Sequence, residues 1–238
     1  MNNNIRIRKP DRMLVLRLAL YFLGMVILAF GICLNSQTAL GVTPIVSVAY
    51  VISDITGWSF GDTTLIEYSA FVLIEVIIHC ASKKYRQIIP DLLQIAVSII
   101  FTRFMNLFTY IIPNFRDDLA GTIWAGIPIR IVFLVIAIVM TGVGAALSLN
   151  MRIIPNPGDG IVLAISDTVH KSVGFVKNCV DISCVCITAL ICVFVIHGIL
   201  GIGIGTIAAM IGVGRVIALF NYLVGVQNGT GEGIVGDR

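Results

Sequence analysis

Charged residues are scarce in this 238-residue sequence. Asp, Glu, Lys and Arg make up 12% of the chain, whereas hydrophobic residues make up 58%. Soluble domains carry roughly 25% charged residues, so a soluble fold of this length could not cover so much apolar surface. The mean hydropathy of +0.99 points the same way. The sequence therefore predicts a polytopic membrane protein embedded in a lipid bilayer.

Motifs for metal binding, catalysis and cofactors are missing as well. The six cysteines include no C-x-x-C pair and lie in or beside apolar runs, which predicts small apolar side chains instead of a disulfide or metal site. The zinc-protease motif H-E-x-x-H does not occur, and we expect no enzymatic activity and no cofactor. The glycines of residues 198–206 follow an apolar span and predict close helix packing, not nucleotide binding. The net charge of +3 is spread over loops, which argues against nucleic-acid binding.

Long apolar runs dominate what remains. A membrane helix needs about 20 apolar residues. The runs of that length are 13–34, 63–80, 92–112, 127–149, 178–197 and 203–224. Two further segments, 44–56 and 157–169, each begin with a proline. At 1.5 Å per residue they reach about 20 Å, against a hydrocarbon core of roughly 30 Å, so they predict half-membrane or re-entrant helices.

The two short segments belong to an internal repeat. An offset of 113 residues (157 − 44 = 113) aligns Arg17 with Arg130, Gly31 with Gly144, Pro44 with Pro157, Ser53 with Ser166 and Asp54 with Asp167. Apolar matches come easily in such a chain, but polar, Gly and Pro matches at one offset do not. In the last span of each half the offset is 112, which pairs Arg103 with Arg215.

The repeat predicts the architecture. With three true spans in each half, the second half lies upside down relative to the first. We therefore expect an all-α membrane protein of two inverted repeats, residues 13–112 and 127–225, each with three transmembrane helices and one short proline-led helix. Residues 1–12 and 226–238 are predicted cytoplasmic segments, and residues 113–126 an external linker.

Positive charge predicts the orientation, because cytoplasmic loops carry an excess of Lys and Arg. If the short segments re-enter, eleven basic residues are cytoplasmic and only Arg116 is external. If they cross instead, four of the eleven move outside while Arg116 moves inside, and the count becomes eight against four. The four are Lys83, Lys84, Arg86 and Arg152. The distribution favours re-entrant segments, with oblique crossing as the alternative, and both termini in the cytoplasm.

The starts of the short segments are candidate binding positions. Thr43 and Asn156 precede Pro44 and Pro157, which is the usual form of a helix start. Asp159 lies in the first turn of the second segment, where the helix dipole favours a carboxylate. Two helix N-termini buried near the membrane centre would direct free N–H groups at a substrate or ion. The alternative is a pair of well-capped re-entrant hairpins without a ligand.

Arg103 and Arg215 interrupt the last span of each half. A buried arginine costs at least a few kcal/mol in a bilayer, so it normally faces a cavity, a carboxylate or a headgroup. A structural ion pair and an anion-binding site both fit. The candidate counter-charges in the spans are Glu67, Glu75 and Asp181.

Four other charged residues lie near helix ends. Asp54 and Asp167 end the two short segments, where the helix dipole disfavours a carboxylate, so they are either coupling residues or solvent-facing loop residues. Arg17 and Arg130 lie near span ends, and we expect them to snorkel to the interface.

Three short motifs resemble a known family. They are Leu40-Gly-Val-Thr-Pro44, Thr56-Gly-Trp-Ser-Phe-Gly61 and Gly203-Ile-Gly-Thr206. The chain resembles the YczE/YitT-like bacterial integral membrane proteins, which show LG-x-x-P, TG-x-S-x-G and G-x-G-T motifs. The second half departs from the first motif and reads Pro155-Asn-Pro-Gly-Asp-Gly160. The resemblance implies a bacterial inner-membrane location and a transport role, without a substrate.

The leading functional hypothesis is a small secondary transporter or channel-like protein for a small polar or anionic solute. In this hypothesis the two proline-led helices meet near the membrane centre, with Arg103 and Arg215 beside the site. The competing hypothesis is a membrane scaffold or accessory protein that transports nothing. A homodimer is open, because six spans make a small transporter.

Overall fold

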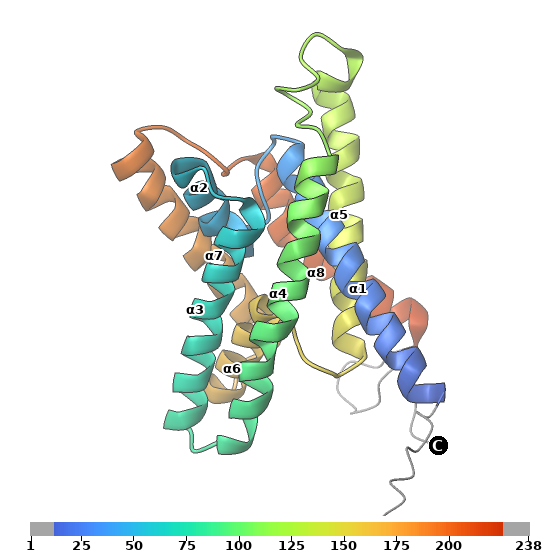
Figure 1. Cartoon of the computed structure of the whole chain (residues 1–238), viewed down its shortest axis with the longest axis vertical. Coiled ribbons are helices and arrows are strands. Elements are labelled where there is room, and N and C mark those ends of the chain that lie inside the picture. The colour runs from blue at the N-terminus through green and yellow to red at the C-terminus, as the bar shows by residue number, and fades with distance from the viewer. Residues whose placement is uncertain (1–11, 226–238) are drawn as a thin grey trace, which may run out of the picture.

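Six long helices form the bundle in the computed structural model, which describes residues 12–225 (Figure 1). All six are long and apolar enough to cross a membrane. They are α1 (Arg12–Gln37), α3 (Phe60–Ala81), α4 (Ile88–Ile111), α5 (Ile127–Asn150), α7 (Val173–Ile191) and α8 (Ile204–Val224). The described residues contain no strand, so the all-helical, multi-pass prediction is confirmed for them. The predicted cytoplasmic segments lie almost entirely outside the described residues.

Two of the long helices begin four or five residues earlier than predicted. The helix α4 begins at Ile88 and not at residue 92, and the turn Tyr85–Gln87 (η2) precedes it. The helix α7 begins at Val173 and not at residue 178, because the Ser172 hydroxyl accepts a hydrogen bond from the Phe175 amide and caps the new first turn. A π-helical turn (η4, Cys192–Ile196) continues α7. The added turns carry Asp91 in α4 and Lys177 in α7, whose side chains are largely buried in protein. Hydropathy alone excludes such polar residues from a span.

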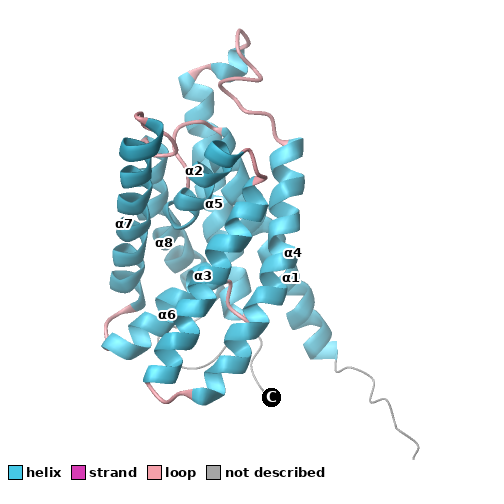
Figure 2. Cartoon of the chain, turned by 60° about the vertical axis from the view of Figure 1, so that its left-hand side comes forward, coloured by secondary structure: helices cyan, strands magenta, loops and turns pink. Residues whose placement is uncertain are grey.

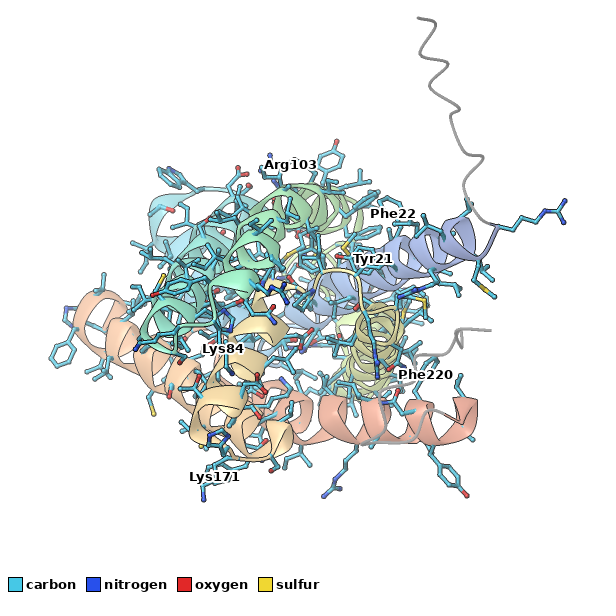
Figure 3. All side chains as sticks on the ribbon, turned by 90° about the horizontal axis from the view of Figure 1, so that it is seen from below. Tyr21, Phe22, Lys84, Arg103, Lys171 and Phe220 are labelled. Atoms are coloured by element: carbon cyan, nitrogen blue, oxygen red, sulfur yellow. The ribbon has the colours of Figure 1, made fainter. Side chains whose placement is uncertain are left out.

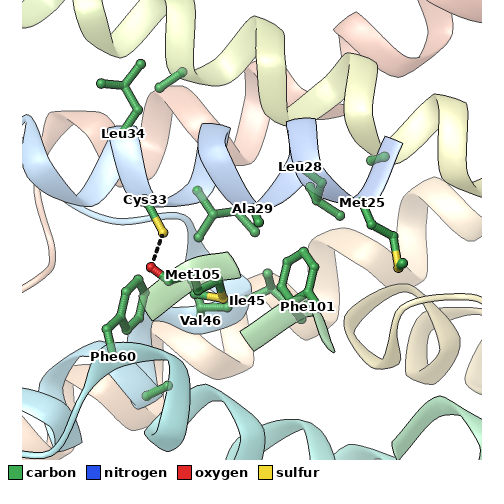
Figure 4. Close-up of a cluster of buried hydrophobic side chains, with 14 of the residues drawn as sticks. Met25, Leu28, Ala29, Cys33, Leu34, Ile45, Val46, Phe60, Phe101 and Met105 are labelled. Carbon is green, nitrogen blue, oxygen red and sulfur yellow. Dashed lines mark hydrogen bonds between the residues drawn. The ribbon is translucent and has the colours of Figure 1, made fainter. Parts of the chain in front are cut away.

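The two proline-led segments are helices. The first comprises η1 (Pro44–Val46) and α2 (Ser47–Thr56), and the second is α6 (Pro157–Val169). Each begins inside the bundle. Figure 4 shows Ile45 and Val46 of η1 among side chains of α1 and α4. In Figures 1 and 2, α6 lies at the end of the molecule that holds the α3–α4 connection, and α2 lies towards the other end.

The helices on either side of the first short segment, α1 and α3, both contact α4. At the last turn of α1, Gln37 donates a hydrogen bond to the Thr109 carbonyl near the end of α4 (3.1 Å). At the start of α3, the Gly61 amide donates to Asn106 of the same helix (2.7 Å). The end of α1 and the beginning of α3 therefore both lie beside the C-terminal part of α4.

The helices α1 and α5 have the most extensive contact in the bundle. Glycines allow their backbones to approach. A Cβ atom on Gly31 would lie 2.5 Å from the Thr141 amide nitrogen, and one on Gly144 would lie 2.4 Å from the Leu28 amide nitrogen. Small residues are common where membrane helices pack closely, because no hydrophobic driving force holds helices together inside a lipid bilayer.

Arg17 and Arg130 bind backbone carbonyls of the opposite half. Arg130 is buried and donates from Nε to the Thr38 carbonyl and from Nη2 to the Ala39 carbonyl, both at 2.6 Å. Arg17 donates to the Met151 carbonyl at 2.8 Å. Cations are favourable at helix C-termini, where carbonyls lack partners inside the helix. The snorkelling predicted for Arg130 is therefore wrong, and Arg17 too is held by protein.

Candidate functional site

A small central cavity lies where both short helices begin. Its volume is about 30 Å³, which is room for about one water molecule. The first short helix contributes Ile45 and the preceding Thr43, and α6 contributes Gly158 and Asp159 with the preceding Asn156. The structure thus brings three of the predicted binding residues together. The adjoining prolines, Pro44 and Pro157, are buried at the same helix starts.

Thr43 and Asn156 do not cap their helices as predicted. Neither side chain accepts a capping hydrogen bond from its helix. The side-chain amide of Asn35 instead lies 2.9 Å from the Thr43 hydroxyl, and Asn156 Nδ2 donates to the Tyr68 hydroxyl at 3.3 Å. The Asn156 Oδ1 atom is buried without a hydrogen-bond partner. A buried acceptor without a donor is costly, so this oxygen is available to a polar ligand in the cavity.

Lys177 is a site residue that sequence reasoning missed. It precedes the predicted span 178–197, but it lies in the second turn of α7 and lines the central cavity with Asp159. Its Nζ atom lies 3.2 Å from Asp181 Oδ2, one helical turn further on. The available signal was the i, i+4 spacing of a Lys and an Asp. Asp181, predicted as a counter-charge for an arginine, is thus paired with Lys177.

The two span arginines lie away from the central cavity. Arg103 forms an ion pair with Asp62 in the first turn of α3, and its side chain is 55% exposed. Figure 3 shows it at the outer edge of the bundle. Arg215 is exposed on α8, and no carboxylate of the described residues lies within ion-pair distance of it. The prediction that Glu67 or Glu75 pairs with Arg103 is wrong.

A larger cavity of about 290 Å³ lies between α3, α4 and α6, and we call it the α3–α4 cavity. Its polar lining comprises Glu75, His79, Gln87, Asp91, Gln94 and Asp167. His79 Nδ1 lies 2.7 Å from Asp91 Oδ2, and Gln94 Nε2 donates to Glu75 Oε2 at 2.6 Å. At the rim, Asp167 pairs with Lys84 at 3.0 Å. Two of the predicted coupling residues, Glu75 and Asp167, therefore share this cavity.

A third cavity, of about 350 Å³, opens at the other end of the bundle, and we call it the loop cavity. Its lining includes residues 39–42, Asp54, Arg116, Asp117 and residues 199–203. Arg116 Nε lies 2.9 Å from Asp117 Oδ1, and this hydrogen bond holds the pKa of the Asp117 carboxyl below its usual value. The ends of the short helices thus reach opposite cavities, Asp54 the loop cavity and Asp167 the α3–α4 cavity.

Glu67 lies outside these three cavities. It is partly buried in α3, and its Oε2 atom has no hydrogen-bond partner. No hydrogen bond or ion pair of the described residues joins it to the other predicted coupling residues.

Comparison with known proteins identifies the family. The sequence model of a family of unknown function, DUF6198, matches residues 15–222. The chain belongs to the DUF6198 family. A Haemophilus influenzae protein described as uncharacterized is 30% identical over 95 residues. That match spans 40% of this chain and 40% of the relative. No solved structure matches the chain. Neither finding names the YczE/YitT-like group, so that resemblance stays a prediction.

Proposed function

We propose that this DUF6198 protein carries a small polar solute across the membrane through the central cavity. One observation carries the proposal. The central cavity, where two helix N-termini meet, lies in a bundle with larger cavities at opposite ends. Midplane sites formed by discontinuous helices, with access from either side, are typical of secondary transporters. Non-helical backbone at this depth is tolerated where it lines such a cavity or is buried in protein.

An inverted repeat is part of the proposal, and matched side-chain contacts support it. Arg17 binds the Met151 carbonyl and Arg130 binds the Thr38 carbonyl, and the offset between matching partners is 113 residues in both cases (130 − 17 = 113; 151 − 38 = 113). The ends of the short helices match in the same way, because the Ser53 hydroxyl donates to the Trp58 carbonyl and the Ser166 hydroxyl donates to the Lys171 carbonyl. Contacts that repeat between the halves at one offset are difficult to explain without a two-fold relation.

Re-entry of the short helices is also proposed. The contacts of α1 and α3 with the C-terminal part of α4 support it for the first segment, because the chain enters and leaves at one end. For the second segment, the ion pair between Lys84 and Asp167 supports it, because it joins the end of α6 to the α3–α4 connection.

We propose that the protein lies in the bacterial inner membrane with both termini in the cytoplasm. We also propose that it transports without enzymatic activity, as a monomer or a homodimer.

The lining of the central cavity bears on the charge of the solute. Its charged groups are Lys177 and Asp159, and Lys177 forms an ion pair with Asp181. The other polar groups of the lining are neutral. The arginines that favoured an anion lie elsewhere. We therefore propose a solute that is neutral or zwitterionic, with hydrogen-bonding groups for Thr43 and Asn156.

The test is uptake into proteoliposomes that contain the full chain, with labelled neutral amino acids, polyols and small sugars as the panel. Asn156→Leu and Thr43→Val should each reduce uptake by about 5- to 150-fold, because losing one hydrogen bond in a buried site costs about 1–3 kcal/mol. Ser183→Val on the exposed face of α7 is the control and should transport normally. If the folded protein takes up none of these solutes faster than empty liposomes do, the transport proposal is contradicted and the scaffold hypothesis is favoured.

A further inference from the structure

A buried acid–amide pair lies beside α6 in the α3–α4 cavity. Glu75 comes from α3 and Gln94 from α4, and each is only 1% exposed. Gln94 Nε2 donates to Glu75 Oε2 at 2.6 Å. The other carboxylate oxygen of Glu75, Oε1, and the amide oxygen of Gln94, Oε1, have no hydrogen-bond partner. Two buried acceptors without a donor are a costly arrangement, and such groups require an explanation.

The two unpartnered oxygens face the same point. A Cβ atom built on Gly160 of α6 would lie 2.7 Å from Gln94 Oε1, 2.8 Å from Glu75 Oε1 and 2.9 Å from Gln94 Nε2. Glycine at this position therefore leaves the space in which the two acceptors converge. Both oxygens can accept and neither can donate while Glu75 is ionised. A single proton on Glu75 would supply the missing donor for both.

No cation among the described residues is available to neutralise Glu75. His79 on α3 bonds Asp91 on α4 at 2.7 Å, and Lys84 bonds Asp167 at the end of α6 at 3.0 Å. On α7, Lys177 bonds Asp181 at 3.2 Å. The other charged group of α6 is Asp159, which is acidic like Glu75. An ionised Glu75 would therefore be a buried, unpaired charge among other carboxylates, which is unfavourable by several kcal/mol.

We propose that Glu75 and Gln94 form a proton-binding site, in which Glu75 Oε1–H donates to Gln94 Oε1 and Gln94 Nε2 donates to Glu75 Oε2. The two hydrogen bonds close a ring and satisfy both unpartnered oxygens with one proton. That proton comes from water in the α3–α4 cavity and returns to it on release. The described residues hold no cluster of three or more His, Cys, Asp or Glu side chains suited to a metal ion. This favours a proton over a bound cation.

The matching position in the other half has no such site. The residues 113 positions from Gly160 and Glu75 are Ser47 and Thr188 (160 − 47 = 113; 188 − 75 = 113). Their hydroxyl oxygens lie 2.8 Å apart, and both residues are fully buried. This pair is neutral and already satisfied. If the chain transports as proposed above, a proton site reached from one cavity only would couple that transport to the proton gradient.

The test is infrared spectroscopy of the purified full chain in lipid nanodiscs at neutral pH. A protonated carboxylic acid has a carbonyl band that a carboxylate lacks, and it shifts on exchange into D₂O. Glu75→Gln should remove one such component, and it should fold because the new amide can make both hydrogen bonds. Gln94→Met should shift that component, because the proton loses its acceptor. Glu67→Gln, the matched change in the same helix, should leave it in place.

Two results would overturn the inference. One is a carbonyl region that is the same in Glu75→Gln, Gln94→Met and the unmodified protein, since two independent variants then show no protonated Glu75. The other is a Na⁺ titration at constant pH that raises the unfolding temperature of the unmodified protein and not of Glu75→Gln, which would make the pair a cation site. Neither measurement uses flux. A carbonyl band from protonated Glu75 without solute uptake would therefore contradict only the transport proposal. Solute uptake without that carbonyl band would contradict only the proton site.

Discussion

At the scale of single residues, Arg130 has two functions that a lipid-facing arginine would not have. Its guanidinium satisfies the carbonyls of Thr38 and Ala39 just after α1, and it places a positive charge at the negative end of the helix dipole. Ala39 adopts a left-handed backbone conformation (φ 52°), so the chain turns sharply there towards the first short helix. Arg130 therefore fixes the loop that delivers Thr43 to the central cavity.

Replacing Arg130 by methionine should reduce stability by about 2–4 kcal/mol, because it removes two charge-assisted hydrogen bonds and leaves two carbonyls unpaired. Arg17→Met is the matched comparison and should cost less, because Arg17 is only partly buried and donates to one carbonyl, that of Met151. Thermal unfolding in detergent with the same buffer measures both. Equal losses for the two variants would contradict the role assigned to burial and to the second hydrogen bond.

At the scale of elements, the two short helices end alike. The Ser53 hydroxyl donates to the Trp58 carbonyl at 2.7 Å, and the Ser166 hydroxyl donates to the Lys171 carbonyl at 2.6 Å. The residue that ends each helix adopts a left-handed backbone conformation. It is Gly57 (φ 71°) in the first helix and His170 (φ 54°) in the second. These features repeat at the offset of 113 residues. Glycine adopts this conformation without strain, whereas a residue with a Cβ atom does not.

Exchanging glycine at these two ends should therefore have opposite effects. His170→Gly should raise stability, and Gly57→Ala should lower it, each by about 1 kcal/mol, since a left-handed residue with a Cβ atom costs roughly 1–2 kcal/mol. A Cβ atom on Gly57 would meet no other atom within 4 Å, so backbone strain alone would be measured there. Unfolding temperatures of the two variants provide the check. A less stable His170→Gly would mean that the imidazole makes a contribution larger than the strain.

The elements themselves were largely predictable, and the contacts between them were not. Apolar length predicts the six spans, and Pro157 marks the first residue of α6 because a proline fits the first turn of a helix. The partner of Arg103, the convergence of Glu75 and Gln94, and the place of Lys177 all depend on how helices rotate against each other. Hydropathy says which segments are apolar, but not which face of a helix meets which neighbour. Side-chain roles at the site were therefore open until the packing was known.

At the scale of the whole molecule, the two ends of the bundle differ in charge. The ion pair of Lys84 with Asp167 holds the α3–α4 connection against the end of α6, so Lys83, Lys84 and Lys171 gather at one end. The other end carries Arg116, which is paired with Asp117. Because positively charged loops stay in the cytoplasm, the α3–α4 cavity should face the cytoplasm and the loop cavity should face outwards.

Thiol labelling tests this orientation. Cys80, Cys179 and Cys186, the exposed native cysteines, are first replaced by serine. Single cysteines at Ile123, which is 75% exposed beyond α4, and at Lys84 or Lys171 then report the two ends. In intact bacteria, a membrane-impermeant maleimide should label position 123, and it should label positions 84 and 171 only after permeabilisation. Labelling of 84 and 171 in intact cells, with 123 protected, would invert the orientation. The proton site at Glu75 and Gln94 would then take up its proton from outside, and the direction of the proposed coupling would reverse.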